Sequence, residues 1–136
     1  MLGYAQDIEA EAIKNKEFRL VLYTAKYSQL VLISLKPREQ IGSETHKLDQ
    51  FFRVEAGVGE AVLDGVKTPI TAGFAVLVPA GTEHNIVNTG KDDLKLYTIY
   101  SPPNHRDGVR HHTKAEAKAD REHFDGKTTE SSAAVP

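Results

Sequence analysis

The sequence predicts an all-β protein, a sandwich or barrel with short helical segments at its two ends. From residue 18 onward, apolar residues recur in short runs of Leu, Val, Ile, Tyr and Phe, the residue types that suit strands. Glycine or proline follows nearly every run, and such regular punctuation is typical of many short strands. The sequence contains no internal repeat.

Each predicted strand has its own end signal. The first two strands are residues 18–27 and 28–36, and Pro37 ends the second of them. Asp64 and Gly65 are a strong signal for a two-residue hairpin turn. The other predicted strands, each followed within two residues by glycine or proline, are 50–55, 60–63, 74–78, 85–88 and 94–100.

We expect one domain with two appended segments. A chain of 136 residues is long enough for one domain with a real core and too short for two ordinary ones. Residues 1–17 are acidic and alanine-rich and predict an N-terminal arm or short helix. Residues 18–103 are the predicted barrel, and residues 104–136 are a polar C-terminal tail.

The tail carries one helix signal. Thr113 and Glu116 have the spacing of a capping box, which predicts a short helix over residues 114–123 with Gly126 as its stop. Residues 127–136 have the composition of a disordered terminus.

Composition excludes several classes of function. The 17 Lys and Arg residues against 19 Asp and Glu give a formal charge of −2, so no basic surface for nucleic acid is expected. The absence of cysteine excludes disulfides, thiolate metal sites and thiol nucleophiles. The N-terminus lacks a signal-peptide pattern and the apolar runs are too short to span a bilayer. We expect a cytoplasmic protein that binds neither nucleic acid nor membrane.

The first two strands are apolar on both faces. Leu20 and Leu22 alternate with Val21 and Tyr23, whereas a sheet with one solvent-exposed face should alternate apolar and polar residues. Either a terminal segment or a second subunit must cover the outer face. We favour a homodimer whose interface includes these strands.

A cluster of polar side chains shares an inward orientation near the third strand. Along an extended chain, Glu44, His46 and Gln50 have the same parity as Phe52 and Val54, which belong in the core. Buried polar groups are costly without partners. A bound metal ion would partner a carboxylate, an imidazole and an amide at once.

A second inward histidine follows a tight turn. The buried strand at 74–78 leads into Pro79 and Gly81, and His84 opens the next strand with the inward parity of Ile86. A rigid turn of this kind fixes the direction of one side chain, as a preformed ligand site requires.

These residues resemble the motifs of the cupin family. The second cupin motif is a Gly, five residues, Pro, one residue, Gly, two residues, His, three residues and Asn. Every position of that motif is matched, by Gly73, Pro79, Gly81, His84 and Asn88.

The first cupin motif is matched in part. His46 fits its second His, and Gly57 fits its closing Gly. The departures are Glu44 in place of the first His, Gln50 in place of the Glu and Arg38 in place of the opening Gly. The chain is similar to small single-domain cupins of the kind labelled mannose-6-phosphate isomerase-like, a label that rests on fold and says little about substrate.

The resemblance implies a double-stranded β-helix, or jelly-roll barrel, with a divalent metal ion (Fe, Mn, Zn or Ni). Carried over by position, the ligands are Glu44, His46, Gln50 and His84. This set keeps the two-His-one-carboxylate composition that suits Fe(II) or Mn(II). Asp49 is the alternative to Gln50 if the strand carries a bulge.

The leading functional hypothesis is a metal-dependent enzyme that acts on a small molecule, as a sugar or keto-acid isomerase or as a dioxygenase. Glu44 would double as the catalytic proton carrier. The alternatives are a non-catalytic cupin homodimer that binds a small ligand or a metal, and a structural homodimer with a vestigial site.

Four histidines lie outside these motifs. They are predicted to belong to a solvated tail, with a lid or a second metal site as the alternative, and they are His105, His111, His112 and His123.

Overall fold

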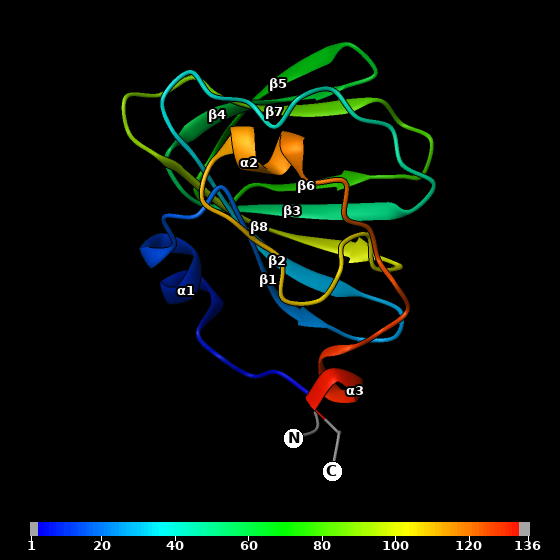
Figure 1. The fold of residues 1–136 in the computed structure, drawn as a ribbon. Coiled ribbons are helices and arrows are strands. Elements are labelled where there is room, and N and C mark those ends of the chain that lie inside the picture. The colour runs from blue at the N-terminus through cyan, green and yellow to red at the C-terminus, as the bar shows by residue number, and fades with distance from the viewer. Residues whose placement is uncertain (1–2, 134–136) are drawn as a thin grey trace.

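The computed structural model describes residues 3–133, which form two antiparallel sheets packed face to face (Figure 1). The strands are β1 (Arg19–Thr24), β2 (Gln29–Leu35), β3 (Asp49–Ala56), β4 (Val58–Leu63), β5 (Val66–Thr71), β6 (Ala75–Val78), β7 (His84–Asn88), β8 (Leu94–Ser101) and β9 (Arg110–His111). The helices are α1 (Ile8–Lys14), α2 (Lys114–Ala119) and α3 (Thr129–Ala133). The predicted all-β jelly-roll with short terminal helices is confirmed.

The two sheets differ in width. The larger has the strand order β6-β3-β8-β2-β1-β9, and the smaller has the order β5-β4-β7. Residues 40–44 extend the smaller sheet through two isolated bridges to β7, one of which joins Glu44 to His84. A gap, which we call the seam, therefore lies between the β1–β9 edge of the larger sheet and residues 40–44 at the edge of the smaller sheet.

The core fills the space between the sheets. In β3 the alternation is regular, because Gln50, Phe52 and Val54 are buried while Phe51 and Arg53 are only half-buried. Phe52 and Val54 pack in one apolar cluster with Ile86 of the smaller sheet. Complete burial of each such side chain contributes about 1.5–3 kcal/mol to folding. The inward parity expected for Gln50 is confirmed.

Strand β5 was not expected from the sequence. Its residues are mostly exposed, and Pro69 within it argues against a strand with neighbours on both sides. β5 is an edge strand of the smaller sheet, where a missing N–H costs no ladder bond. The predicted hairpin turn before it is present, with Asp64 at φ 47° and Gly65 at φ 82°.

The N-terminal segment covers part of the outer face of the larger sheet. α1 contacts β2, β3 and β8, and its Ala12 is fully buried. The Lys95 ammonium donates to the carbonyl of Asn15 at 2.5 Å and to the Ser34 hydroxyl at 3.0 Å, which anchors the end of this segment. A terminal segment is thus one of the two covers expected for the apolar outer face, and the homodimer stays a prediction.

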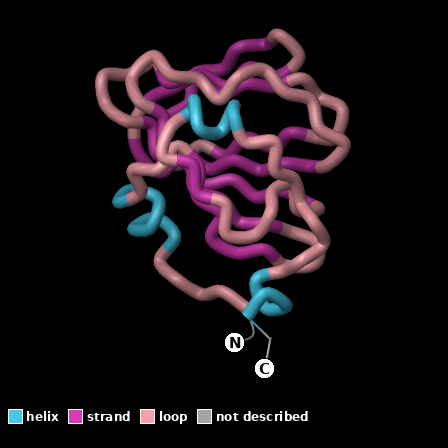
Figure 2. The backbone as a smooth tube through the Cα atoms, in the orientation of Figure 1, coloured by secondary structure: helices cyan, strands magenta, loops and turns pink. Residues whose placement is uncertain are grey.

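The tail is more ordered than its composition suggests (Figure 2). The expected disorder of residues 127–136 is wrong for 127–133, because α3 lies against β1 and Thr129 accepts a hydrogen bond from the Thr24 amide at 2.8 Å. Residues 134–136 lie outside the described part of the chain. α2 is shorter than predicted and ends at Ala119, well before Gly126. None of the helices in residues 3–133 is both long and apolar enough to cross a membrane.

Candidate functional site

Four side chains that the sequence singled out come from three separate segments. Gln50 opens β3, His84 opens β7, and Glu44 and His46 lie in the loop between β2 and β3. Glu44 and His84 exchange two backbone hydrogen bonds of 2.9 Å, and residues paired in this way direct their side chains to the same face. We call Glu44, His46, Gln50 and His84 the interior cluster.

The turn before β7 fixes the His84 ring. Gly81 has φ +89°, which favours glycine, and its amide donates to the carbonyl of His46 at 2.8 Å. Nδ1 of His84 lies 2.9 Å from the carbonyl oxygen of Thr82. A carbonyl oxygen only accepts, so Nδ1 donates to it and Nε2 faces the interior.

Nε2 of His84 meets the Gln50 side chain. Gln50 is 3% exposed, its Oε1 lies 3.0 Å from Nε2 of His84, and its Nε2 donates to Thr98 at 3.0 Å. Asp49, the alternative ligand, is exposed and accepts a hydrogen bond from the Ala80 amide at 3.0 Å. Gln50, and not Asp49, faces the interior.

Glu44 and His46 form the other half of the cluster. Their Oε2 and Nε2 atoms are 3.2 Å apart, but Nε2 of His46 is buried and has no aligned hydrogen-bond partner within the described residues. Burial acts to raise the pKa of Glu44. Contact with His46, together with the charges of His46, Arg19 and His84, outweighs burial and leaves that pKa below its ordinary value.

The donor atoms of the cluster suit a divalent ion, but their side chains do not converge on a single point. Two imidazoles, a carboxylate and an amide oxygen are a donor set for octahedral divalent metals, and His46 keeps a buried nitrogen without a partner. Among residues 3–133, no three His, Cys, Asp or Glu side chains are grouped closely enough to hold a metal ion. The contact between Gln50 and His84 would have to open for all four donors to meet an ion.

A chain of hydrogen bonds runs from the core into the tail. The Tyr100 hydroxyl lies 3.2 Å from Nε2 of His105, and Nδ1 of His105 lies 2.6 Å from Oε2 of Glu122. The Glu122 carboxylate accepts a hydrogen bond from Nδ1, so Nε2 accepts a hydrogen bond from the Tyr100 hydroxyl. Burial raises the pKa of Tyr100 to about 12, which keeps the hydroxyl protonated. Burial also lowers the pKa of His105 against the opposing effect of Glu122.

A second tail histidine engages the barrel through Arg19. Nη1 of Arg19 lies 3.3 Å from Nδ1 of His111, and Nε2 of His111 lies 3.0 Å from Asp120. The expectation of a solvated tail is therefore wrong for His105 and His111, which are 6% and 4% exposed. The ring nitrogens of both histidines are paired with side chains of the protein and not with solvent. Composition alone does not reveal such pairs.

The buried Gln29 side chain anchors the first residues of the tail to the barrel. Its Oε1 accepts from the amides of Asn104 and His105, and its Nε2 donates to the carbonyl of His105 at 2.7 Å. From there residues 104–122 run over the seam, with α2 in front of the gap between the sheets (Figure 1).

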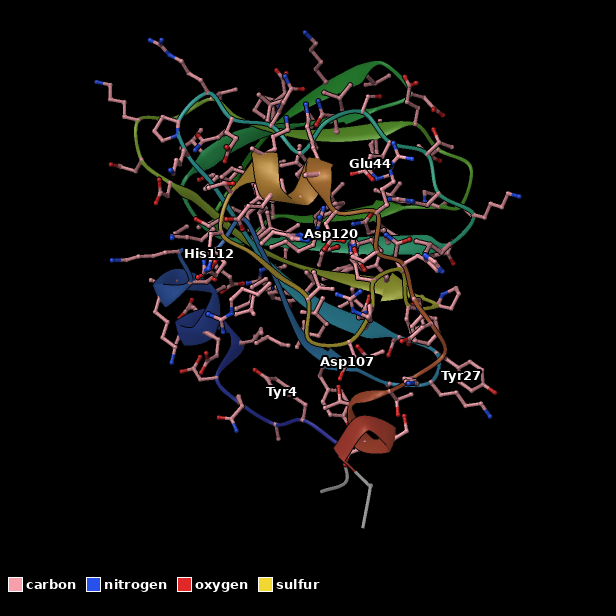
Figure 3. All side chains as sticks on the ribbon, in the orientation of Figure 1. Tyr4, Tyr27, Glu44, Asp107, His112 and Asp120 are labelled. Carbon is pink, nitrogen blue, oxygen red and sulfur yellow. The ribbon has the colours of Figure 1, made fainter. Side chains whose placement is uncertain are left out.

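A cavity of about 260 Å³ lies beneath this cover. Figure 3 shows Glu44 and Asp120 at the same part of the molecule, beside α2. The cavity walls come from the start of β1, from residues 41–44 and from the tail, and they include Phe18, Arg19, Ile41, Glu44, His105 and Glu122.

Two residues of the cupin motifs have structural roles. Gly57 has φ +95°, and a Cβ there would lie 2.7 Å from the carbonyl oxygen of Asp93, so no larger residue fits. Asn88 is 1% exposed and bonds to the carbonyls of Leu35 and Asp92 and to the amide of Gly90, all at 2.9 Å. These two residues therefore stabilise the barrel.

Comparison with known proteins gives consistent matches. A family model described as Cupin domain matches residues 31–100. The chain is 42% identical over 123 residues to the uncharacterized protein YrkC of Bacillus subtilis (strain 168), and the match covers 85% of this chain but 66% of that protein, just under two thirds.

Solved structures agree. The crystal structure of BH2720 from Bacillus halodurans has a TM-score of 0.85 and 42% identity, and the match covers 86% of this chain and 94% of that one. A predicted oxalate decarboxylase from Thermotoga maritima has a TM-score of 0.54 and 26% identity, with 57% of this chain and 68% of that one covered.

Proposed function

The chain belongs to the cupin family, and from that premise we propose that it binds a divalent metal ion at the interior cluster and acts there on a small molecule. One observation carries the proposal. Nε2 of His46 is buried without an aligned partner among the described residues, beside a second histidine, His84, whose Nδ1 is tied to a backbone carbonyl and whose Nε2 faces Gln50. Metal-ligating histidines are oriented in that way.

Glu44, His46, Gln50 and His84 would hold the ion. Once bound, it would supply Lewis acidity to a substrate carbonyl or hydroxyl. Glu44 lines both the cluster and the neighbouring cavity, so its carboxylate can accept a proton from a molecule in the cavity. The lowered pKa of Glu44 keeps its carboxylate ionised, the form in which it can coordinate an ion or accept a proton.

Tyr100 and His105 form a second hydrogen-bonded group beside the interior cluster. The Tyr100 ring lies edge-on to His46 with ring centroids 6.0 Å apart, and its hydroxyl proton is held toward His105. Glu122 orients the imidazole from the other side, at 2.6 Å. Of these groups, His105 and Glu122 line the cavity together with Glu44, so proton carriers border the space that a substrate would occupy.

Metal content measured on untagged protein tests this proposal. We expect up to one divalent ion per chain in the wild type, and loss of most of it in His46→Ala and in His84→Ala. His112→Ala is the matched control, because that side chain is exposed in the tail. Full metal content in His84→Ala would contradict the site assignment.

The alternative is a cupin that binds a metal or small ligand without turnover. Metal analysis does not distinguish it from an enzyme, because both predict an occupied cluster. Turnover assays with sugar phosphates, keto-acids and oxygen-dependent substrates do distinguish them. The resemblance to a predicted oxalate decarboxylase adds small organic acids to the substrates worth assaying.

We also propose that the protein is a homodimer through the outer face of its larger sheet. Leu77 is 65% exposed and lies opposite Phe51 on that face, beyond the strands that α1 contacts. Sedimentation at micromolar concentration should give about twice the chain mass, and Leu77→Asp should give the monomer. Val66→Asp is the control, since Val66 is 66% exposed on the other sheet. A monomeric wild type would overturn this proposal.

A further inference from the structure

Arg19 occupies an unusual position in the wall of the cavity. It shares the inward face of β1 with Val21 and is 9% exposed. Its charge lowers the pKa values of Glu44 and Glu122, so its guanidinium faces the same interior as these groups. Burial of a charged group is costly unless it is paired.

No carboxylate in the described residues pairs with Arg19. Its Nε is buried and has no hydrogen-bond partner in that part of the chain, where Nη1 contacts Nδ1 of His111 at 3.3 Å. Nε of Arg53 on β3 also lacks an aligned hydrogen bond among the described residues, but it lies 3.2 Å from the Glu55 carboxylate, an ion pair that Arg19 does not have.

The carboxylates around the cavity are already engaged by histidines. Glu44 lies 3.2 Å from His46, Asp120 lies 3.0 Å from His111, and Glu122 lies 2.6 Å from His105. Three carboxylates therefore lie around the cavity, and none of them forms an ion pair with the Arg19 guanidinium.

We propose that Arg19 binds the carboxylate or phosphate group of a small anionic ligand in this cavity. The inference rests on the proposed function and adds the chemical class of the molecule that the interior cluster acts on. An oxyanion would give the buried Nε the acceptor that the chain does not provide.

The arrangement of donors favours such a ligand. With Nη1 turned to His111, the Nε edge of the guanidinium is left for an incoming oxyanion, and planar forks of this kind bind carboxylate and phosphate in a bidentate manner. Lys114 and Lys118 of α2 also line the cavity and add positive charge at its rim.

The size and position of the cavity limit the ligand further. About 260 Å³ is slightly less than the range of about 300–1,000 Å³ typical of ligand pockets, so the ligand is small. Glu44 lies in the same wall as Arg19 and in contact with His46. An acid anchored by its anionic group at Arg19 would therefore place the rest of its short chain toward the interior cluster.

Titration of the wild type with sodium malonate and with sodium phosphate tests the proposal, using sodium chloride at matched ionic strength as the blank. The readout is the arginine Nε–H proton resonance, assigned to Arg19 by its loss in Arg19→Lys. We expect a saturable shift with at least one of the two anions and none with chloride. A stronger response to malonate indicates a carboxylate ligand, and a stronger response to phosphate indicates a phosphorylated one.

Calorimetry on variants completes the test. Arg19→Lys keeps the charge but not the fork, and we expect anion affinity to fall at least tenfold while metal content is unchanged. Arg110→Gln, which removes an exposed cation from neighbouring β9, should leave affinity unchanged. If Arg19→Lys does not fold, the resonance is assigned by its through-space contact with the Phe18 ring, whose centroid lies 5.4 Å from the guanidinium carbon of Arg19, and the wild-type titration still decides.

The outcomes separate the two proposals. Absence of any saturable Arg19 shift in a metal-loaded wild type would overturn the anion site and leave the metal proposal standing. Retention of metal in His84→Ala would instead overturn the metal proposal. Equal anion affinity in Arg19→Lys and the wild type would show that the guanidinium fork does not bind the ligand.

Discussion

The histidines on the barrel wall and those in the tail differ in how fully their nitrogens are used. In the tail, His105 lies between Tyr100 and Glu122, and His111 lies between Arg19 and Asp120. On the wall, His46 has a buried nitrogen without an aligned partner among the described residues. Unused bonding capacity in a buried group is costly and needs a reason.

This difference separates two roles. The tail histidines connect residues 104–122 to the barrel, and both of their ring nitrogens serve that purpose. Of the wall histidines, His46 has a nitrogen without an aligned partner among the described residues, and Nε2 of His84 contacts only a neutral amide that can turn away. We infer that the tail pairs hold the cover in place and that the interior cluster carries the chemistry.

The largest effect that would sharpen this contrast is the loss of one tail pair. Glu122→Gln removes the charge that orients His105, and both side chains are almost fully buried. We expect the free energy of unfolding to fall by about 2–3 kcal/mol in urea denaturation, with metal content unchanged. Glu83→Gln, on an exposed turn, is the matched control. Loss of metal together with stability would break the division of roles.

The second effect concerns the far end of the tail. Deleting residues 127–136 removes Thr129, which accepts a hydrogen bond from the buried Thr24 and donates one to Asp107. We expect a loss of about 1 kcal/mol from the Thr24 bond. A truncated protein as stable as the wild type would show that α3 does not contribute.

Much of the wall could be predicted from the sequence, because short-range rules govern it. Period-two alternation places Gln50 inward beside Phe52, and the Pro79–Gly81 turn sets the direction of His84. β5 escaped prediction because its apolar pattern is weak, although Asp64 and Gly65 already indicated a partner for β4.

The tail could not be predicted, because its order depends on pairs that are distant in the sequence. Gln29 anchors His105 from 76 residues away, and Arg19 reaches His111 from 92 residues away. The sequence of a polar segment predicts a solvent-exposed tail unless its distant hydrogen-bond partners are known. The sequence does not single out Arg19, because β1 is apolar on both parities. The inward face of that strand therefore cannot be identified from the alternation of apolar and polar residues.

A third effect, on metal affinity, would test the wall directly. Gln50→Glu replaces a neutral amide with a second carboxylate, and we expect Mn(II) to bind about tenfold more tightly, equivalent to about 1.4 kcal/mol. Calorimetric titration measures the change, and Gln29→Glu serves as a control at a buried amide that instead holds the tail. Unchanged affinity in Gln50→Glu would mean that Gln50 bonds only to His84 and Thr98.

The smallest expected effect is the pH dependence of the tail. Burial lowers the pKa of His105 below its ordinary value of 6.5, despite the opposing effect of Glu122. Below pH 6.5 the unfolded chain therefore binds a proton at this position that the folded chain does not. Stability must fall as the pH decreases from about 6.5 toward the lowered pKa.

Glu122 acts in the same direction at lower pH. Burial tends to raise its pKa, but contact with His105 and with the Arg106 amide leaves it below the ordinary value of 4.5. The stability that its ionised form contributes is present above pH 4.5 and is lost as the pH falls through the lowered pKa. Both groups therefore make the closed tail less stable in acid.

Calorimetric melting of chelator-treated protein between pH 7.5 and 5 isolates the His105 contribution, because metal binding by the interior cluster is then absent. We expect the midpoint to fall as the pH is lowered in the wild type and to fall less in His105→Gln, which cannot take up the proton. His123→Gln, at an exposed tail position, should follow the wild type. Identical slopes in His105→Gln and the wild type would show that the fall comes from groups on the wall, and the tail would lose its distinction as the acid-sensitive side of the molecule.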